Sequence, residues 1–385
     1  MKVFHIVENL DKGAVENWLV TIFLTSRKSR PDWEWTFYCI LGQEGRLDQQ
    51  VMAAGGRIIY SPYPISRKRR FLRHLRRVVR DGHYDILHVH HDYLSGFYLL
   101  ATIGIRFSKR ILHIHNTDEA VPVGSPALRR MLLGPMRYSA IQLSDVIVGI
   151  SRDSLSFFLK DATLKRKRST VLYYGIDLAR FGAVNREHGW LRKELELPDD
   201  VKILLFTGRM NETKNPSFVV EILRVLIERR KNVCAIFVGK GSEEDIIREK
   251  SRKYGLEDRV RLPGWRNDIA GIMQEADVFV FPRVEHPKEG LGLVVVEAQS
   301  AGLPMVLSNG IVRDAIVIDE LAHFVPLRDN PAEWASVIET ILNEPKPISM
   351  EQAILRMMQS PFELTNATLN LISLYEQIEI PAYRR

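Results

Sequence analysis

Short apolar runs alternate with amphipathic segments along the first half of the chain. The apolar runs are KVFHIV, WTFYCIL, RIIY, DILHVHH, RILHIHN and DVIVGIS, and helical patterns lie between them, for example at 15–25 and 95–106. Continuous apolar runs of this length are typical of parallel strands that are buried on both faces. Their alternation with helices over short connections predicts a doubly wound parallel sheet with right-handed crossovers.

A second series of the same kind follows a polar, helix-prone linker at 183–200. Its apolar runs are KILLFTGR, CAIFVGKGS, RVRLPGW, DVFVFP, LPMVLSNG and AHFVPL, and helical patterns follow at 331–343 and 362–375. A chain of 385 residues is long for one domain and natural for two. The sequence therefore predicts an α/β protein with two Rossmann-like domains, residues 1–182 and residues 183–361.

The stretch EHPKEGLGLVVVEAQSAGLP lies between two predicted strands of the second domain and carries two acids, Glu289 and Glu297, eight residues apart. On one helix, this offset would bring both carboxylates to roughly the same side. A helix that starts near Gly290 would also direct four free amides at an anion, those of Gly290, Leu291, Gly292 and Leu293. Carboxylates repel phosphate but suit sugar hydroxyls, because they accept hydrogen bonds from them. A surface helix with an acidic cap is the alternative, but the position after a buried strand favours a ligand site.

Cations and glycines follow the other predicted strands of this domain. Arg209 and Lys214 come after KILLFTG, and they combine a planar fork of donors with a compact charge, which suits a diphosphate. Two ordinary surface cations in a polar loop are the alternative. The remaining candidates after the strands are Gly239, Gly241, Trp265 and Arg266.

Histidines collect near the ends of strands in the first domain. They are His88, His90, His91, His113 and His115. Alternation along a strand places His113 and His115 on one face of the sheet. Such histidines are usually satisfied core residues, and no carboxylate pattern supports a metal site here.

The formal net charge of +7 and the sequence pI of about 9.3 have a local origin in RKRRFLRHLRRVVR, residues 67–80. Its apolar residues have helical spacing, so it predicts an amphipathic helix. The arginines form either a solvated outer face or a contact with anionic lipid, for which Arg69, Arg70, Arg73 and Arg77 are the candidates. No nucleic-acid-binding motif accompanies this charge.

The two cysteines, Cys39 and Cys234, lie in separate apolar runs, which favours reduced core thiols and a reducing compartment. The N-terminal apolar run is too short for a signal peptide, and no run approaches the length of a membrane span. We therefore expect a cytoplasmic protein, with possible association at the cytoplasmic face of the membrane.

The E-G-x-G-L segment that is followed by E-A-x-x-x-G-x-P resembles the donor-sugar signature of the retaining GT-B glycosyltransferases of family 4. Two elements of the first domain support the resemblance. ENLDKGAVENW is similar to a G-G-x-E loop, with Gly13 and Glu16 matching and Ala14 in place of the second glycine. TVLYYGIDLARF is similar to an Asn-Gly-Ile-Asp turn, with Tyr174 in place of the asparagine.

The resemblance implies a GT-B fold, with the two domains facing across a cleft and a C-terminal helix at about 362–385 crossing back to the first domain. The first domain would bind the acceptor and the second domain the nucleotide sugar. The residues that match the family's catalytic positions are Arg209, Lys214, Glu289 and His115. Those that match its donor-binding positions are Gly13, Ala14, Gly239, Gly241, Trp265, Arg266, Gly290, Leu291, Gly292, Leu293 and Glu297. Glu16 and His90 would lie nearer the acceptor.

The resemblance further implies a retaining, metal-independent glycosyltransferase without a cofactor. Its donor would be a nucleotide sugar, with UDP- and GDP-sugars favoured, and its acceptor a saccharide or lipid-linked saccharide in surface polysaccharide or glycolipid synthesis. The absence of an Asp-x-Asp motif agrees with metal independence. A GT-B-like sugar-nucleotide epimerase or hydrolase and an inactive nucleotide-sugar-binding protein are the alternatives.

Overall fold

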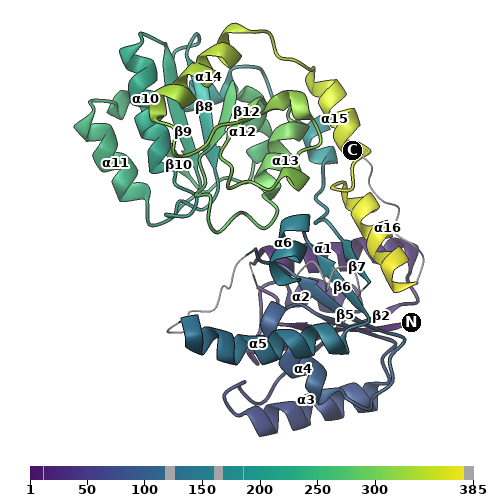
Figure 1. The fold of residues 1–385 in the computed structure, drawn as a ribbon. Helices are drawn as coiled ribbons and strands as arrows, with labels where there is room; N and C mark the ends of the chain where they lie inside the picture. Colours follow the sequence, from purple (N-terminus) through teal and green to yellow (C-terminus); the bar gives the residue numbers. More distant parts are fainter. Residues whose placement is uncertain (12, 118–125, 160–167, 185, 377–385) are drawn as a thin grey trace. The chain divides into compact units, whose positions relative to one another are not determined.

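The computed structural model describes residues 1–11, 13–117, 126–159, 168–184 and 186–376. The chain forms two compact units (Figure 1). Unit 1 comprises Met1–Ile176 and the segment from Leu364, and unit 2 comprises Asp177–Glu363. The division therefore falls at Ile176, a few residues before the expected boundary at 182.

Unit 1 contains a parallel sheet of seven strands in the order β3-β2-β1-β4-β5-β6-β7. The strands are β1 (Lys2–Val7), β2 (Glu34–Cys39), β3 (Arg57–Tyr60), β4 (Ile86–Val89), β5 (Lys109–Ile114), β6 (Val146–Gly149) and β7 (Ser169–Val171). The described helices are α1 (Ala14–Ser29), α2 (Asp48–Ala53), α3 (Lys68–Gly82), η1 (Asp92–Leu94), α4 (Ser95–Ala101), α5 (Pro126–Leu143), α6 (Arg152–Phe158) and α16 (Leu364–Tyr375). The predicted parallel, doubly wound sheet is confirmed.

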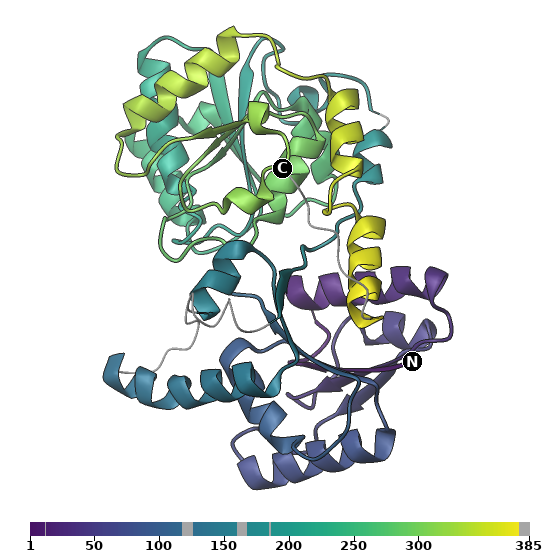
Figure 2. The same ribbon diagram turned by 45° about the vertical axis from the view of Figure 1, so that its right-hand side comes forward.

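The two faces of this sheet differ in chemistry because side chains alternate along each strand. One face is apolar: Phe4 and Ile6 pack with Phe71 of α3 and Tyr98 of α4 in one core cluster. The other face carries His5 between its aromatic neighbours Trp35 and Phe37 and is covered by α1 and α16, which contact each other. Figure 2 shows α16, in yellow, beside α1, in purple.

The helix α16 is attached to unit 1 by polar contacts at its C-terminal end. Buried Lys109 at the start of β5 donates to the carbonyl oxygen of Leu374, where a cation also complements the helix dipole. Arg30 forms an ion pair of 2.7 Å with Glu376. Residues 377–385, which the prediction included in this helix, lie outside the described residues.

Unit 2 contains a parallel sheet of six strands in the order β10-β9-β8-β11-β12-β13. The strands are β8 (Lys202–Thr207), β9 (Val233–Val238), β10 (Val260–Gly264), β11 (Val278–Phe281), β12 (Met305–Leu307) and β13 (Ala322–Phe324). The described helices are α8 (Ala179–Gly182), α9 (Trp190–Glu194), α10 (Ser217–Glu228), α11 (Glu244–Lys253), η2 (Glu257–Arg259), α12 (Ile269–Glu275), α13 (Leu293–Ser300), η3 (Arg313–Ala315), η4 (Asp319–Leu321), α14 (Pro331–Asn343) and α15 (Met350–Met358). Among the described residues, no helix is both long enough and apolar enough to cross a membrane.

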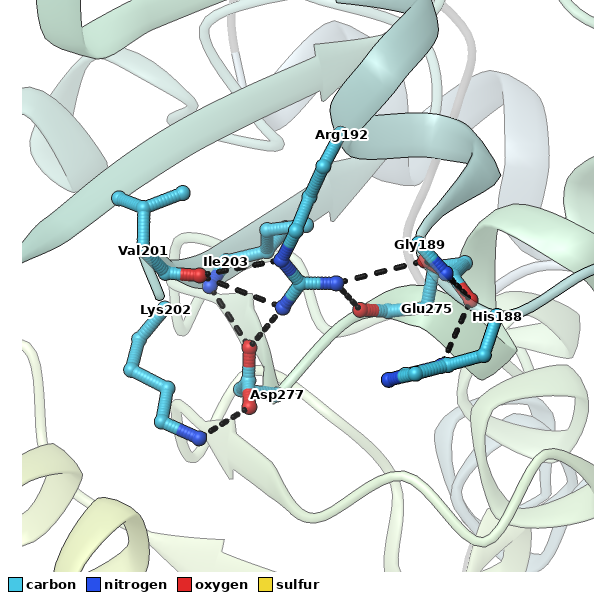
Figure 3. A network of polar contacts seen from close by, with 8 residues as sticks. All are labelled: His188, Gly189, Arg192, Val201, Lys202, Ile203, Glu275 and Asp277. Atoms are coloured by element: carbon cyan, nitrogen blue, oxygen red, sulfur yellow. Dashed lines mark hydrogen bonds and ion pairs between the residues drawn. The ribbon is translucent and has the colours of Figure 1, made fainter. Parts of the chain in front are cut away.

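A buried polar network fixes the linker helix α9 to this sheet (Figure 3). The guanidinium of Arg192 lies between Glu275 at 3.3 Å and Asp277 at 3.1 Å, and it also donates to the carbonyl oxygen of Val201. Asp277 in turn accepts from Lys202 and from the amide of Ile203. The polar linker that the sequence suggested is therefore anchored through the charge of Arg192 together with buried Leu191.

Replacing Arg192 with methionine should lower the free energy of unfolding of unit 2 by about 3 kcal/mol, because the buried carboxylate of Glu275 and the half-buried carboxylate of Asp277 would lose their shared cation. The matched control is Arg224→Met, which removes an exposed helical pair with Glu228 and should cost only about 0.4 kcal/mol. Urea unfolding of both variants measures the difference. Equal losses would show that the network does not anchor the linker.

Candidate functional site

The strand order of the second, parallel sheet reverses between β8 and β11. Successive strands run outward from β8 through β9 to β10, and from β11 through β12 to β13. Open α/β sheets bind ligands beside the carboxyl ends of the two strands at such a switch point. Lys214 lies in the loop after β8, and Glu289 lies in the loop after β11, so the fold brings these two candidates together.

Glu289 is held by two cations at this switch point. Its Oε2 atom bonds to Nζ of Lys214 and lies 2.9 Å from Nε of Arg283. The Nε proton of Arg283 is not aligned on that oxygen and has no acceptor among the described residues. The backbone of Glu289 is fixed as well, because its amide donates to the carbonyl oxygen of Gly310.

The cluster carries an excess of positive charge. Arg209 and Arg283 are close enough to Lys214 to lower its pKa, although burial is the larger cause and Glu289 opposes both. Arg209 is exposed and forms no ion pair within the part of the chain that the structure describes. Three cations against one carboxylate leave a net charge of +2, which suits a diphosphate.

Arg283 is a site residue that the sequence interpretation missed. It follows β11 directly, and its side chain is only 8% exposed. Its Nη1 and Nη2 atoms donate to the carbonyl oxygens of Thr213 and Lys288, so it links the loops after β8 and β11. A basic residue that ends a buried strand at a ligand-binding edge was the available signal.

The helix near the two acids begins later than expected. The prediction of a start near Gly290 is wrong, because α13 begins at Leu293 and its N-cap Gly292 has a left-handed backbone with φ of +80°. That conformation ends the preceding loop and favours glycine. Gly290 and Leu291 therefore belong to the loop, and the free helical amides start at Leu293.

The late start also changes the relation between the two acids. Glu289 lies in the loop and Glu297 in the second turn of α13, so the predicted common helical side is wrong. Glu297 forms an ion pair with Arg180 of α8. Burial raises the pKa of Glu297, and the Arg180 guanidinium opposes that shift.

Gly239 and Gly241 have a packing role in the structure. A Cβ atom at Gly239 would lie 2.0 Å from the carbonyl oxygen of Gly208, and one at Gly241 would lie 2.1 Å from that of Met210. The loops after β8 and β9 can therefore approach only with glycine at these positions. This close approach explains both glycines without a ligand.

Two candidates for contact with a ligand, Trp265 and Arg266, follow β10, and they differ in how far other residues already occupy them. Trp265 is 71% exposed. Arg266 forms ion pairs with Glu194 and with Asp268, which occupy its Nε, Nη1 and Nη2 atoms. The Arg266 guanidinium also lies over the Trp190 ring, 5.9 Å from its centroid, so only its opposite face remains for stacking.

Unit 1 has its own switch point, between β1 and β4, and the histidines gather there. His90 bonds to His5 and to His115 at 3.0 Å each, and His88 bonds to His113 at 3.2 Å. His113 and His115 lie on one face, as alternation predicts. His91 is separate from this set: its ring packs edge-on against Tyr98 at 5.6 Å, and Tyr98 belongs to the opposite face.

Both ring nitrogens of His115 are engaged within the protein. Nε2 bonds to His90, and Nδ1 bonds to the hydroxyl of Tyr174. The backbone amide of His115 donates to Asp92 at 2.9 Å. The imidazole therefore has no free nitrogen for a ligand in this state.

Three further candidates of unit 1, Gly13, Ala14 and Glu16, lie at the start of α1, after the loop that follows β1. Gly13 is the N-cap of α1, Ala14 is its first residue, and both are exposed. Glu16 folds back over Gly13, where a Cβ atom would lie 1.7 Å from its Oε2. Burial raises the pKa of Glu16.

The histidines include two triads whose ring nitrogens lie within 4.8 Å of one another: His5, His88 and His90, and His90, His113 and His115. Imidazole nitrogen is a suitable ligand for zinc and related ions. However, these nitrogens already bond to one another, and neither triad contains a carboxylate to balance a buried divalent charge.

The basic helix α3 is docked on unit 1. Its apolar stripe, Phe71, Leu75 and Val79, is fully buried, and Arg76 donates to the carbonyl oxygens of Ala101 and Ile103 beyond α4. The four candidate membrane residues, Arg69, Arg70, Arg73 and Arg77, are all exposed. The exposed surface of α3 is therefore charged, and its apolar stripe is buried within unit 1.

Two family models match the chain in turn. The model described as Glycosyltransferase Family 4 matches residues 20–180, and the model described as Glycosyl transferases group 1 matches residues 190–355. The protein is a glycosyltransferase. Its two parallel sheets, each with helices on both faces, are the halves of the GT-B fold.

Named relatives and solved structures agree with this assignment. The glycosyltransferase is 24% identical over 377 residues to EpsF of Bacillus subtilis, which is named as a glycosyltransferase, and the match covers 97% of this chain and 96% of EpsF. It is 25% identical over 255 residues to the Escherichia coli UDP-Gal:alpha-D-GlcNAc-diphosphoundecaprenol alpha-1,3-galactosyltransferase, covering 65% of this chain and 64% of that protein. The crystal structure of Anabaena HepE in complex with UDP gives a TM-score of 0.78 at 17% identity, covering 98% of this chain and 100% of HepE.

The buried histidines should make unit 1 of the glycosyltransferase sensitive to acid. Burial lowers the pKa of His5 and His115 to about 3 and that of His91 to about 4, and it holds the pKa of His88, His90 and His113 well below the ordinary histidine value. The unfolded chain takes up these protons below a pH of about 6.5, before the folded state does, so stability is present above that pH and is lost as pH falls. Each histidine should contribute about 1.4 kcal/mol per pH unit in this window.

Hydrogen exchange measured at pH 7, 6 and 5, corrected for intrinsic rates, tests this expectation. Amides of β4 and β5 should lose protection faster than those of β8 and β9, because none of the described histidines of unit 2 is fully buried. Equal losses in the two units would contradict the account.

Proposed function

We propose that the glycosyltransferase transfers a sugar from a nucleotide-sugar donor to a saccharide or lipid-linked saccharide, with retention of configuration and without a metal ion. The observation that carries this proposal is the cation cluster of net charge +2 around Glu289 at the switch point of unit 2. Complexes of HepE with UDP and with UDP-glucose support a nucleotide-sugar donor, and we favour a UDP-sugar.

In this proposal the diphosphate of the donor binds at Arg209, Lys214 and Arg283. Since Lys214 and Arg283 hold Glu289 in the free protein, the arriving diphosphate would share these cations and leave Glu289 able to accept sugar hydroxyls. The cations would then stabilise the charge that develops on the leaving nucleotide. This supply of positive charge by the protein supports metal independence.

Glu297 would accept the ribose hydroxyls. Its present partner, Arg180, is 42% exposed, so it can move aside or turn toward the nucleotide. Exposed Trp265 and the face of Arg266 are the candidates for stacking on the base. Gly239 and Gly241 would keep the adjoining loop close to the nucleotide.

Unit 1 would bind the sugar acceptor at the carboxyl edge of its sheet. His115 offers its backbone there, because its ring nitrogens are occupied. Gly13, Ala14, Glu16 and His90 lie around the same switch point and would contribute to donor and acceptor recognition. For retention, we propose that a phosphate oxygen of the leaving group takes the acceptor proton, so that no protein base is required.

The acceptor class rests on the relatives and on charge. The Escherichia coli relative is named for a diphosphoundecaprenol acceptor, and the structural neighbour WaaG is named for lipopolysaccharide biosynthesis. A lipid-linked acceptor would place the protein at the cytoplasmic face of the membrane, where the exposed arginines of α3 could contact anionic lipid.

Substitution of Glu297 should mainly affect UDP binding, and substitution of Glu289 should mainly affect sugar transfer. Glu297→Ala should weaken UDP binding about tenfold or more, because hydrogen bonds to a charged acceptor would be lost. Glu289→Ala should leave UDP affinity intact, since it frees two cations, and should lower transfer about 100-fold. Calorimetry with UDP and a transfer assay with UDP-sugars measure the two effects, and Glu228→Ala in an exposed pair is the control.

Several outcomes would refute this assignment. If neither Glu289→Ala nor Glu297→Ala changes UDP affinity or the rate of transfer, the proposed mechanism is wrong. Release of a free sugar or an epimer without an acceptor would favour the epimerase or hydrolase alternative. Absence of UDP binding together with absence of transfer would favour a protein that has lost its chemistry.

Neutralising Arg69, Arg70, Arg73 and Arg77 with glutamine should weaken binding to vesicles that contain anionic phosphatidylglycerol more than tenfold, because each cation near such a surface contributes about 1 kcal/mol. The control removes the same charge from exposed positions of unit 2, namely Arg230, Arg248, Arg252 and Lys253. Vesicle sedimentation at low salt measures both variants. Equal binding of the two, or binding that does not depend on anionic lipid, would rule out this role for α3.

A further inference from the structure

Seven buried side chains of unit 1 form one continuous chain of hydrogen bonds. In order they are Tyr174, His115, His90, His5, Tyr375, His88 and His113. The links between His115, His90 and His5 are 3.0 Å each, that from Tyr375 to His88 is 2.7 Å, and that from His88 to His113 is 3.2 Å. The contact of 3.4 Å between Tyr375 and His5 is the longest link.

Each side chain of this hydrogen-bonded chain can donate one hydrogen bond. Burial lowers the pKa of all five imidazoles, so they are neutral, and it raises the pKa of both phenols, so they keep their protons. A neutral imidazole donates through one nitrogen and accepts through the other. Because both nitrogens of the four inner histidines are used, the bonds on each side of Tyr375 run in one direction. If Tyr375 accepted from both His5 and His88, its own proton would be buried without an acceptor, so Tyr375 donates to one of them and the whole chain runs in the same direction.

The end at His113 decides that direction. Its Nε2 atom is buried and has no partner among the described residues. A chain running toward His113 would leave an N–H group there without an acceptor, whereas the opposite direction leaves only a lone pair. Buried N–H groups without partners are the rarer and more costly case.

The favoured direction makes all five histidines Nδ1–H tautomers. His113 then donates to His88, His88 to Tyr375, Tyr375 to His5, His5 to His90, His90 to His115, and His115 to Tyr174. The Tyr174 hydroxyl accepts this last bond, and its own proton has no acceptor among the described residues. Tyr174 follows β7 and thus lies at the carboxyl edge of the sheet, where ligands bind.

We propose that Tyr174 donates a hydrogen bond to a neutral sugar hydroxyl of the substrate, and that the buried chain through His115, His90, His5 and Tyr375 fixes its direction. Burial is the main cause of the raised pKa of Tyr174, and the nearby charges of Asp92 and Glu16 add to it, so these charges oppose a phosphate at this point. The same carboxylates can accept hydrogen bonds from other hydroxyls of a sugar. This subsite deepens the proposed function and rests on its saccharide substrate.

A metal ion is the rival occupant of the histidine set. It would have to break hydrogen bonds between the rings and bring a divalent charge into a core without a carboxylate ligand. Zinc binding by the protein would therefore overturn the proposal.

The first test is the tautomeric state of histidine in the full chain, measured by ¹⁵N chemical shifts. The five rings should be neutral Nδ1–H tautomers. Tyr375→Phe should release the fixed tautomer of His115 although the two residues do not touch. The matched control is Tyr98→Phe, which removes a buried hydroxyl that has no partner among the described residues and should leave every ring of the chain unchanged.

The second test is titration with methyl α-D-glucopyranoside and with inorganic phosphate. The sugar should shift the His115 ring signals, phosphate should not, and Tyr174→Phe should weaken the sugar response about tenfold, as the loss of one neutral hydrogen bond predicts. Neutral Nε2–H rings, a zinc-dependent rise in melting temperature, a response to phosphate alone, or no response to the sugar would each overturn the proposal.

These outcomes can be separated from failure of the proposed function. The tautomer measurement needs no donor or acceptor, and UDP binding depends on unit 2. If UDP does not bind and no transfer occurs, the proposed function fails whatever the tautomers are. If the wild-type protein transfers sugar and Tyr174→Phe is unaffected in sugar affinity, only the subsite fails.

Discussion

The attraction between Glu289 and the two cations Lys214 and Arg283 is the interaction on which the proposed donor site depends. It links the loops after β8 and β11, which are adjacent because the strand order of the parallel sheet reverses between these strands. In the free protein the carboxylate neutralises part of the positive charge that the site would otherwise bury without compensation. The same cations remain in excess, so under our proposal an arriving diphosphate would find a site that is already assembled.

In unit 1 the main electrostatic constraint is the burial of polar imidazole rings. It buries five imidazoles on one face of a sheet without a single charge, by bonding them to one another and to two phenols. A neutral imidazole that donates through one nitrogen accepts through the other, so the directions of neighbouring bonds in this network depend on one another. The C-terminal helix is part of this arrangement, since Tyr375 at the end of α16 joins the two groups of histidines.

Much of the fold could be predicted from the sequence, because buried parallel strands appear as continuous apolar runs such as DVFVFP. The helix start near Glu289 could not, because the left-handed backbone of Gly292 is set by the packing of the loop around it. Arg283 carries no motif, and its role depends on two loops that are distant in sequence. The pairing of Arg180 with Glu297 and the joining of His5 to Tyr375 also depend on tertiary structure, which no local pattern records.

The most direct test of the donor site compares the affinities of the wild-type protein for UDP and for uridine by calorimetry. If the cation cluster around Glu289 recognises the diphosphate, UDP should bind at least about 100-fold more tightly than uridine, since charge-assisted bonds contribute the difference. This preference should shrink at high salt. Equal affinities for the two compounds would contradict the account, because the cations would then have no part in recognising the nucleotide.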